Sequence, residues 1–235
     1  MSVLIMKKED KKYKLNAEEI KKARDRFSST YQLLDKTYPE AHCALLFKNP
    51  LQLLIATILS AQCTDKRVNM VTPALFKKYP TVKSFAQANL GEVQEMIRST
   101  GYFRNKAKNI IAACQRIEQI YEGKVPDKMR DLITLPGVAR KTANVVLWNA
   151  FGVNDGVVVD THVSRISQRL GWTGEKTTAK IERDLMKLTP QENWGKISHL
   201  LIDLGRDVCK APVPVCLSCK LNKFCPSFPH LKKNK

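Results

Sequence analysis

The sequence lacks any hydrophobic run close to the roughly 18 residues that a membrane-spanning helix needs, although 43% of its 235 residues are hydrophobic. It also lacks the features of a secretory signal. The mildly apolar start at Met1–Met6 precedes a group of lysines instead of following one, and no cleavage site of small residues comes after it. These absences predict a cytoplasmic protein that has no membrane partner.

Acidic residues are scarce and unevenly placed. The chain has 22 of them against 40 lysines and arginines, which gives a net charge of +18. No acid follows Asp207, whereas several lysines do. A field this positive recruits polyanions, so the charge favours nucleic-acid binding. Charge alone leaves one alternative open, a basic surface that only keeps the protein in solution.

Internal repeats and strand-like alternation are also missing. Val157–Val159 resembles a strand, but it is short and has no partner run. Apolar residues instead recur at helical spacing, and Asn16 is placed to cap the first helix. The sequence therefore predicts an all-α fold that follows a loose basic tail at residues 1–16. Further helices are expected near residues 50–59, 66–78, 82–88, 91–99, 104–121, 128–134, 140–151, 161–170, 177–188 and 191–207.

The cysteines do not suit a disulfide framework, because their total of seven is odd and no export signal accompanies them. Three of them stand in apolar or helical contexts, as small buried residues do. The other four crowd together with spacings of six, two and five residues: Cys209, Cys216, Cys219 and Cys225. Four thiolates this close indicate a metal centre. Ligation by four cysteines serves both zinc and 4Fe–4S clusters.

The segment 135–143 reads LPGVARKTA and joins two predicted helices. Pro136 and Gly137 force a tight turn, because glycine adopts backbone angles that other residues avoid. The next helix then begins at once and points its unpaired amides outward, where they can bind an anion. Ala139 is small enough to admit a phosphate, and Thr142 adds a hydroxyl donor. The pattern predicts a helix–hairpin–helix that grips a DNA backbone, in preference to an ordinary helix–helix turn.

Lys141 and Asp160 are the candidate catalytic pair, although each has a simpler interpretation. Lys141 lies in the first turn after the hairpin, beside Arg140. A nucleophilic lysine must be neutral, and a helix N-terminus, an adjacent cation and partial burial all favour the neutral amine. The alternative is a lysine that only binds phosphate. Asp160 precedes a predicted helix, so capping that helix is its simpler role.

The string LPGVARKTANVVL at residues 135–147 resembles the hairpin of the endonuclease III family of DNA glycosylases, which usually has Gly where Ala139 stands. The resemblance spans about residues 20–228. It implies that Lys141 attacks C1′ of a damaged nucleotide flipped out of the duplex, while Asp160 stabilises the positive charge that develops on the sugar. A Schiff base and β-elimination would then cut the strand. The implied DNA contacts in this region are Leu135, Gly137, Ala139, Arg140 and Thr142.

His162 matches a histidine beside the family's pocket, and a purely structural role is the alternative. Gln62, in the string LSAQCTD at residues 59–65, resembles the glutamine that fills the gap left by the flipped base. Its amide offers both a donor and an acceptor to the orphaned partner base. The alternative for Gln62 is an ordinary loop residue.

Tyr102, in the string GYFRNKA at residues 101–107, stands where the family commonly has a leucine that acts as a second wedge. An aromatic wedge can stack on a base as well as separate bases. The alternative is that Tyr102 only packs against the following helix. Arg104, Lys106 and Lys108 are expected to contact the DNA backbone.

The spacing of the four cysteines resembles the family's ligand set for a 4Fe–4S cluster, which favours that cofactor over zinc. The cluster would order a loop-rich segment and place basic side chains beside DNA. Because the loop at residues 210–215 is less basic than in the family, Lys220 and Lys223 are expected to make the phosphate contacts there.

The resemblance also implies two all-α lobes. A six-helix lobe at residues 44–153 would end with the hairpin, and residues 17–43 would join 154–235 to hold the cluster. Lys141 would then face Asp160 across the cleft between the lobes. We expect a monomer in a bacterial cytoplasm, associated with the nucleoid, whose partner is double-stranded DNA with damaged bases or abasic sites.

Three functions fit these patterns to different degrees. The first is a bifunctional DNA glycosylase and AP lyase that removes oxidised pyrimidines such as thymine glycol. The second is a monofunctional mismatch adenine glycosylase, against which Lys141 and the lack of a further domain after Cys225 both count. The third is a non-catalytic DNA-binding hairpin module, which would leave the wedges and the cysteines unexplained. The first function is therefore our prediction.

Overall fold

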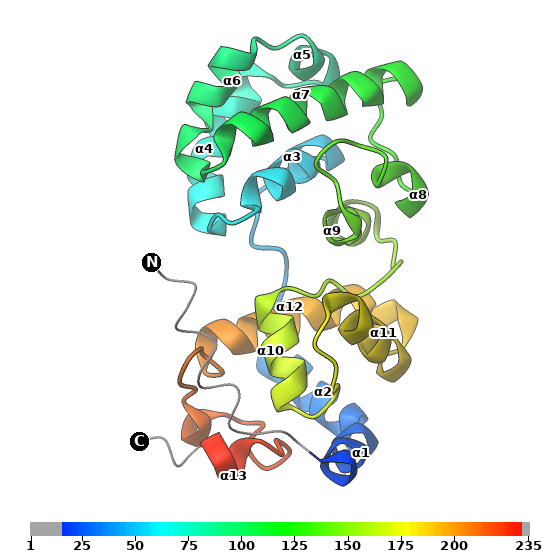
Figure 1. The fold of residues 1–235 in the computed structure, drawn as a ribbon, viewed down its shortest axis with the longest axis vertical. Helices are drawn as coiled ribbons and strands as arrows, with labels where there is room; N and C mark the ends of the chain where they lie inside the picture. Colours follow the sequence, from blue (N-terminus) through cyan, green and yellow to red (C-terminus); the bar gives the residue numbers. More distant parts are fainter. Residues whose placement is uncertain (1–15, 232–235) are drawn as a thin grey trace. The chain divides into compact units, whose positions relative to one another are not determined.

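The computed structural model describes residues 16–231 (Figure 1). Regular structure in that range is helical and includes no β-strand, so the predicted all-α fold is confirmed. Val157–Val159 is buried but irregular. None of the helices between residues 16 and 231 is long and apolar enough to span a lipid bilayer. The tail expected at residues 1–16 lies, apart from Asn16, outside the described residues.

The chain divides into two compact units. One joins Met1–His42 to Gly156–Lys235, and the other is Cys43–Asp155. The expected boundaries at residues 44 and 153 lie beside these divisions. Each unit has its own hydrophobic core.

In the two-segment unit, side-chain caps begin helices and a buried hydrophobic core stabilises their packing. Asn16 and Glu19 form a capping box at the first helix: each side chain accepts from the other residue's backbone N–H. In the core, the ring of Phe27 meets Trp172 edge-on at 4.7 Å between centroids. The helices are α1 (Ala17–Asp25), α2 (Phe27–Thr37), α10 (Thr161–Arg169), α11 (Thr178–Leu188), η3 (Gln191–Asn193), α12 (Trp194–Asp207), η4 (Cys216–Ser218) and α13 (Phe228–Leu231).

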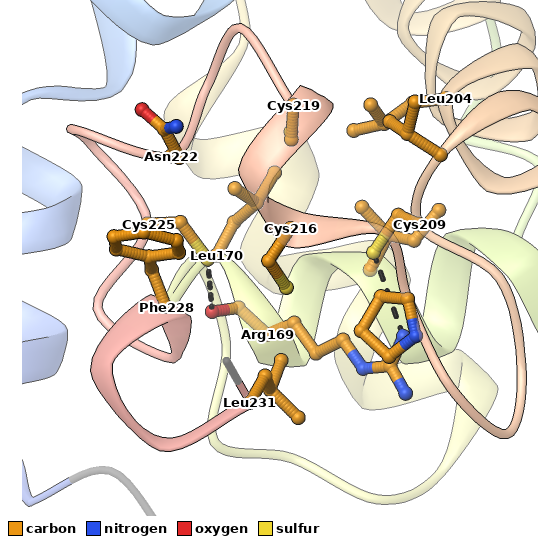
Figure 2. A pocket seen from close by; sticks show the side chains of 13 residues that line it. Arg169, Leu170, Leu204, Cys209, Cys216, Cys219, Asn222, Cys225, Phe228 and Leu231 are labelled. Atoms are coloured by element: carbon orange, nitrogen blue, oxygen red, sulfur yellow. Dashed lines mark hydrogen bonds between the residues drawn. The ribbon is translucent and has the colours of Figure 1, made fainter. Parts of the chain in front are cut away.

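After α12 this unit has little regular structure. The short helices η4 and α13 are joined by turns that surround a cavity lined by the four clustered cysteines and by apolar side chains (Figure 2). A segment with so few helical residues buries little apolar surface of its own, so it depends on other interactions for its order.

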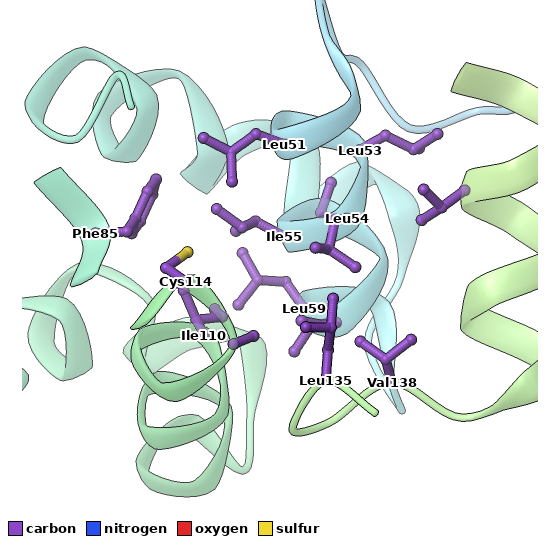
Figure 3. Close-up of a cluster of buried hydrophobic side chains, with 14 of the residues drawn as sticks. Leu51, Leu53, Leu54, Ile55, Leu59, Phe85, Ile110, Cys114, Leu135 and Val138 are labelled. Carbon is purple, nitrogen blue, oxygen red and sulfur yellow. The ribbon is translucent and has the colours of Figure 1, made fainter. Parts of the chain in front are cut away.

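The continuous unit, Cys43–Asp155, is organised around a buried helix. Every residue from Leu53 to Leu59 on α3 is buried, as expected of a helix that is apolar on all sides (Figure 3). Helices α4, α7 and α9 all pack on it. The elements are α3 (Pro50–Ser60), α4 (Asp65–Lys78), α5 (Val82–Ala86), α6 (Leu90–Met96), η2 (Arg98–Thr100), α7 (Phe103–Ile120), α8 (Met129–Leu132) and α9 (Arg140–Phe151). The resemblance implied six helices here. The structure has seven α-helices, of which α5 and α8 are single turns.

Candidate active site and DNA interface

The hairpin between α8 and α9 is anchored by two apolar side chains. Leu135 is 2% exposed and Val138 is 6% exposed, and both extend from the loop toward α3 (Figure 3). The Val138 amide donates to the Leu135 carbonyl at 3.1 Å and closes the turn. Gly137 and Ala139 remain exposed. Inward anchors on either side of Gly137 therefore leave its backbone presented outward, as the sequence pattern predicted.

Gly137 is required by both conformation and space. Its φ of +78° lies in the left-handed region, which a residue with a Cβ adopts at an energetic cost. A Cβ placed there would also lie 2.9 Å from the Cβ of Asn109 on α7. The turn thus packs directly against α7, which fixes its position within the unit.

The first turn of α9 carries the candidate nucleophile. Ala139 is the N-cap residue and has no side-chain cap bond, so it supplies no oxygen to the amides of that turn. Lys141 is exposed, so the partial burial expected from the sequence is wrong for the protein without DNA. Arg140 donates to the carbonyl of Asp155 at 3.0 Å and holds its guanidinium against the end of the same unit. Thr142 is half-buried.

Asp160 caps α10 in the other unit. Its Oδ1 accepts from the Val163 amide at 2.8 Å, which confirms the predicted capping role. His162 follows in the first turn of α10. Its Nδ1 lies 3.2 Å from a guanidinium nitrogen of Arg165 and 2.5 Å from where a Cβ on Gly205 would stand. His162 is therefore closely packed between α10 and α12.

The two candidate wedges share an uncommon backbone conformation. Gln62, in the turn after α3, has φ of +53°, and Tyr102, just before α7, has φ of +48°. Tyr102 is 67% exposed, so the alternative that it packs against the following helix is wrong. Phe103, the first residue of α7, packs against the hydrophobic core of this unit. Arg104 is exposed and lies over the Phe103 ring, 5.5 Å from its centroid.

Lys106 corrects one sequence prediction. Although it was expected to contact DNA, it is only 4% exposed. Its ammonium donates to the carbonyls of Leu59 and Thr100, each at 2.8 Å. Burial lowers the pKa of this lysine from its ordinary value. The charge pattern of a helix does not by itself separate a buried lysine from a solvated one.

The four clustered cysteines are free thiols around one cavity. Burial raises the pKa of Cys225 to about 12 and raises the pKa of Cys216 and Cys219, with the neighbouring thiols adding to each shift. Several thiolates are therefore stable together there only with a compensating cation. No group of three or more metal-ligating side chains among residues 16–231 meets the geometry of a single bound metal ion.

Arg169 supplies one positive charge beside these thiols. The residue is 8% exposed. Its guanidinium donates to the Sγ of Cys209 at 3.5 Å and to the carbonyl of Lys210 at 2.9 Å. Figure 2 shows it reaching across the cavity from α10. Lys220 and Lys223 are exposed on the turns around the cavity. Sequence reasoning missed Arg169, since nothing in its spacing marks it as a neighbour of the cysteines.

Comparison with known proteins first identifies a class. Residues 55–191, more than half of the chain, match the HhH-GPD superfamily of base excision DNA repair proteins. The chain is 57% identical over 195 residues to endonuclease III of Synechocystis, covering 83% of this chain and 89% of that protein. It is 46% identical over 189 residues to endonuclease III of Bacillus subtilis, covering 80% and 86%.

Similar solved structures point to the same family. A trapped endonuclease III–DNA covalent intermediate is 44% identical, with a TM-score of 0.83, and covers 88% of this chain and 97% of its own. A non-covalent endonuclease III–DNA complex is 43% identical, with a TM-score of 0.85, and covers 90% and 99%. The chain therefore belongs to the endonuclease III family. This confirms the predicted function class, a bifunctional DNA glycosylase and AP lyase of base excision repair that acts on oxidised pyrimidines.

Proposed function

We propose that Lys141 is the nucleophile of this reaction. Its amine nitrogen forms a bond to C1′ of the damaged nucleotide, and the bond from C1′ to the base breaks with its electron pair leaving on the base. Opening of the sugar ring gives a Schiff base. Loss of a proton from C2′ then expels the 3′ phosphate oxygen and cuts the strand. The observation that carries the proposal is the exposed position of Lys141 in the first turn of α9, directly after the hairpin.

Asp160 has the complementary role in this proposal. Its carboxylate is held by the Val163 amide in a fixed orientation and stabilises positive charge on the sugar. His162, packed beside it on α10, contacts the flipped nucleotide. Asp160 also accepts the proton that the Lys141 amine loses when it bonds to C1′.

The DNA backbone is gripped by main-chain groups of the hairpin. The amides from Gly137 to Thr142, apart from that of Val138, which closes the turn, donate to a phosphate. Leu135 anchors the turn and Arg140 adds positive charge. Gln62 and Tyr102 enter the duplex around the flipped base, and Arg104 binds the adjacent backbone. Both wedge residues stand on tight turns and are exposed, which is the form that insertion between bases requires.

A 4Fe–4S cluster fits the cavity between Cys209, Cys216, Cys219 and Cys225. The donor set is right, since four thiols and no carboxylate line the cavity. Apart from Arg169 and Asn222, the other lining residues are apolar. Such a cluster supplies covalent cross-links to a segment with few helical residues. Arg169 offsets the charge of the Cys209 thiolate, and the exposed Lys220 and Lys223 bind phosphates beside it.

The proposed partner is double-stranded DNA that contains damaged bases or abasic sites, bound by a monomer in a bacterial cytoplasm near the nucleoid. The two similar solved structures are complexes of endonuclease III with DNA, and the net charge of +18 suits a polyanion.

Borohydride trapping tests the proposal. The wild type, Lys141→Gln and the control Lys128→Gln are incubated with a duplex carrying one thymine glycol, and borohydride is added. A covalent adduct is expected with the wild type and the control but not with Lys141→Gln. An adduct with Lys141→Gln would show that another amine is the nucleophile. If none of the proteins is trapped, an abasic-site duplex separates a wrong lesion from a wrong mechanism, because trapping there needs no base removal.

A further inference from the structure

Lys106 joins the ends of two helices that lead into the wedge turns. Its buried ammonium donates at 2.8 Å to the Leu59 carbonyl, in the last turn of α3, and at 2.8 Å to the Thr100 carbonyl, at the end of η2. Carbonyls at helix C-termini lack partners within their own helix and carry partial negative charge. One lysine on α7 therefore satisfies two such carbonyls at once.

The two bonded carbonyls lie immediately before the candidate wedges. Leu59 precedes Gln62 by three residues, and Thr100 precedes Tyr102 by two. Gln62, Tyr102 and Glu122 are the non-glycine residues with positive φ in the described part of the chain. Conformations of this kind persist only where the surroundings hold them. Two of the three thus follow within three residues of the carbonyls that Lys106 binds.

The surroundings of Lys106 suit a cross-link more than a ligand site. The side chain is 4% exposed, so it is not available to DNA. Removing an ammonium that satisfies two buried carbonyls would leave both without a partner, which favours rearrangement of the turns.

We propose that Lys106 is a positioning residue for DNA opening: it ties the Gln62 turn to the Tyr102 turn, so that both wedges enter the duplex at a fixed separation. The inference rests on the wedge roles proposed above. It adds a residue that touches neither DNA nor the reacting atoms. It predicts a defect confined to substrates whose base must be extruded from a duplex.

The test compares a duplex with a substrate that needs no wedge. Lys106→Met keeps the length of the side chain but removes all its donors, and Lys106→Arg keeps charge and donors. Single-turnover cleavage of a thymine glycol duplex is measured beside borohydride trapping on single-stranded abasic DNA. For Lys106→Met we expect a loss of about ten- to a hundredfold on the duplex, unchanged trapping on the single strand, and partial rescue by Lys106→Arg.

A double-mutant comparison separates positioning from general stability. If Lys106 acts through the wedges, Lys106→Met should cost little further duplex activity in a protein that already carries Gln62→Ala and Tyr102→Ala. Additive losses, or equal losses on both substrates, would overturn the inference. If Lys106→Met does not fold, the activities of Lys106→Arg and wild type on the two substrates are compared instead. A loss confined to the duplex supports the inference, and an equal loss on both substrates overturns it. Failure of the wild type to trap on abasic DNA would instead count against the nucleophile proposal.

Discussion

Gly137→Ala is the substitution whose effect the hairpin geometry defines best. Placing a Cβ on a residue with φ of +78° costs about 1–2 kcal/mol. The same atom would meet the Cβ, Nδ2 and Cγ of Asn109 at 2.9, 3.0 and 3.2 Å, and overpacking of this kind costs about 1–3 kcal/mol. Less freedom in the unfolded chain returns about 0.4–1 kcal/mol. We expect a net destabilisation of about 1–5 kcal/mol.

Equilibrium urea unfolding measures that change, and a second site divides it. Asn109→Ala keeps the closest atom, the Cβ, whereas Asn109→Gly removes it. In a protein that also carries Asn109→Ala, Gly137→Ala should therefore destabilise nearly as much as it does in the wild type. In a protein that carries Asn109→Gly, its effect should be smaller by about 1–3 kcal/mol. Affinity for an abasic-site duplex should fall with Gly137→Ala in every background, because alanine disfavours the left-handed conformation that presents the backbone of residue 137 outward. A Gly137→Ala protein as stable as wild type would refute the reasoning, and an equal effect in all backgrounds would refute its steric part.

Three further predictions follow from individual groups. Asp160→Asn should keep the cap and the stability but lose activity, whereas Asp160→Ala should also lose about 1 kcal/mol; urea unfolding and single-turnover assays separate the two. Burial and nearby positive charges lower the pKa of His199 to about 4. The free energy of unfolding that comes from neutral His199 is thus complete above pH 6.5 and falls by about 3 kcal/mol as the pH drops toward 4. The urea midpoint of His199→Gln should lack that decline. Cys216→Ala should lower the iron and sulfide content of the purified protein, and a zinc-containing wild type would contradict the cluster.

Much of the fold follows from local chemistry that the sequence displays. Asn16, Asn49, Thr64 and Asp160 each cap a helix through a side-chain oxygen, and these are the residue types that caps favour. The all-apolar stretch of α3 predicts its burial. Helix α2 is different, because only Arg26 separates it from α1, with no glycine or proline to mark the break. Its position depends on tertiary packing of its apolar side chains, which local patterns do not reveal.

The candidate site divides in the same way. The hairpin was predictable because Pro136 and Gly137 act on their own backbone. The prediction that Lys106 contacts DNA is wrong, because its position on α7 decides its burial and its charge does not. Apolar residues of α7 recur at Ala107, Ile110, Cys114 and Ile117, all buried, and position 106 lies on that face, four residues before Ile110. Helical periodicity therefore held the signal that its side chain points inward.

The continuous unit, Cys43–Asp155, contains the same arrangement three times. A turn with a left-handed residue, at Gln62, Tyr102 or Gly137, leads within three residues into the N-terminus of α4, α7 or α9. Helix N-termini present unpaired amides and favour anions. The turns at Tyr102 and Gly137 precede helices with no side-chain cap, so each combines an insertable or closely approachable residue with a local preference for phosphate. The Gln62 turn differs, because Thr64 caps α4 and Asp65 adds a negative charge there. All three helices pack on the buried α3. The relative placement of the three turns is thus set by the interior of α3, and a core substitution there, such as Leu54→Ala, should disturb DNA opening even though no residue of that helix interior can reach the duplex.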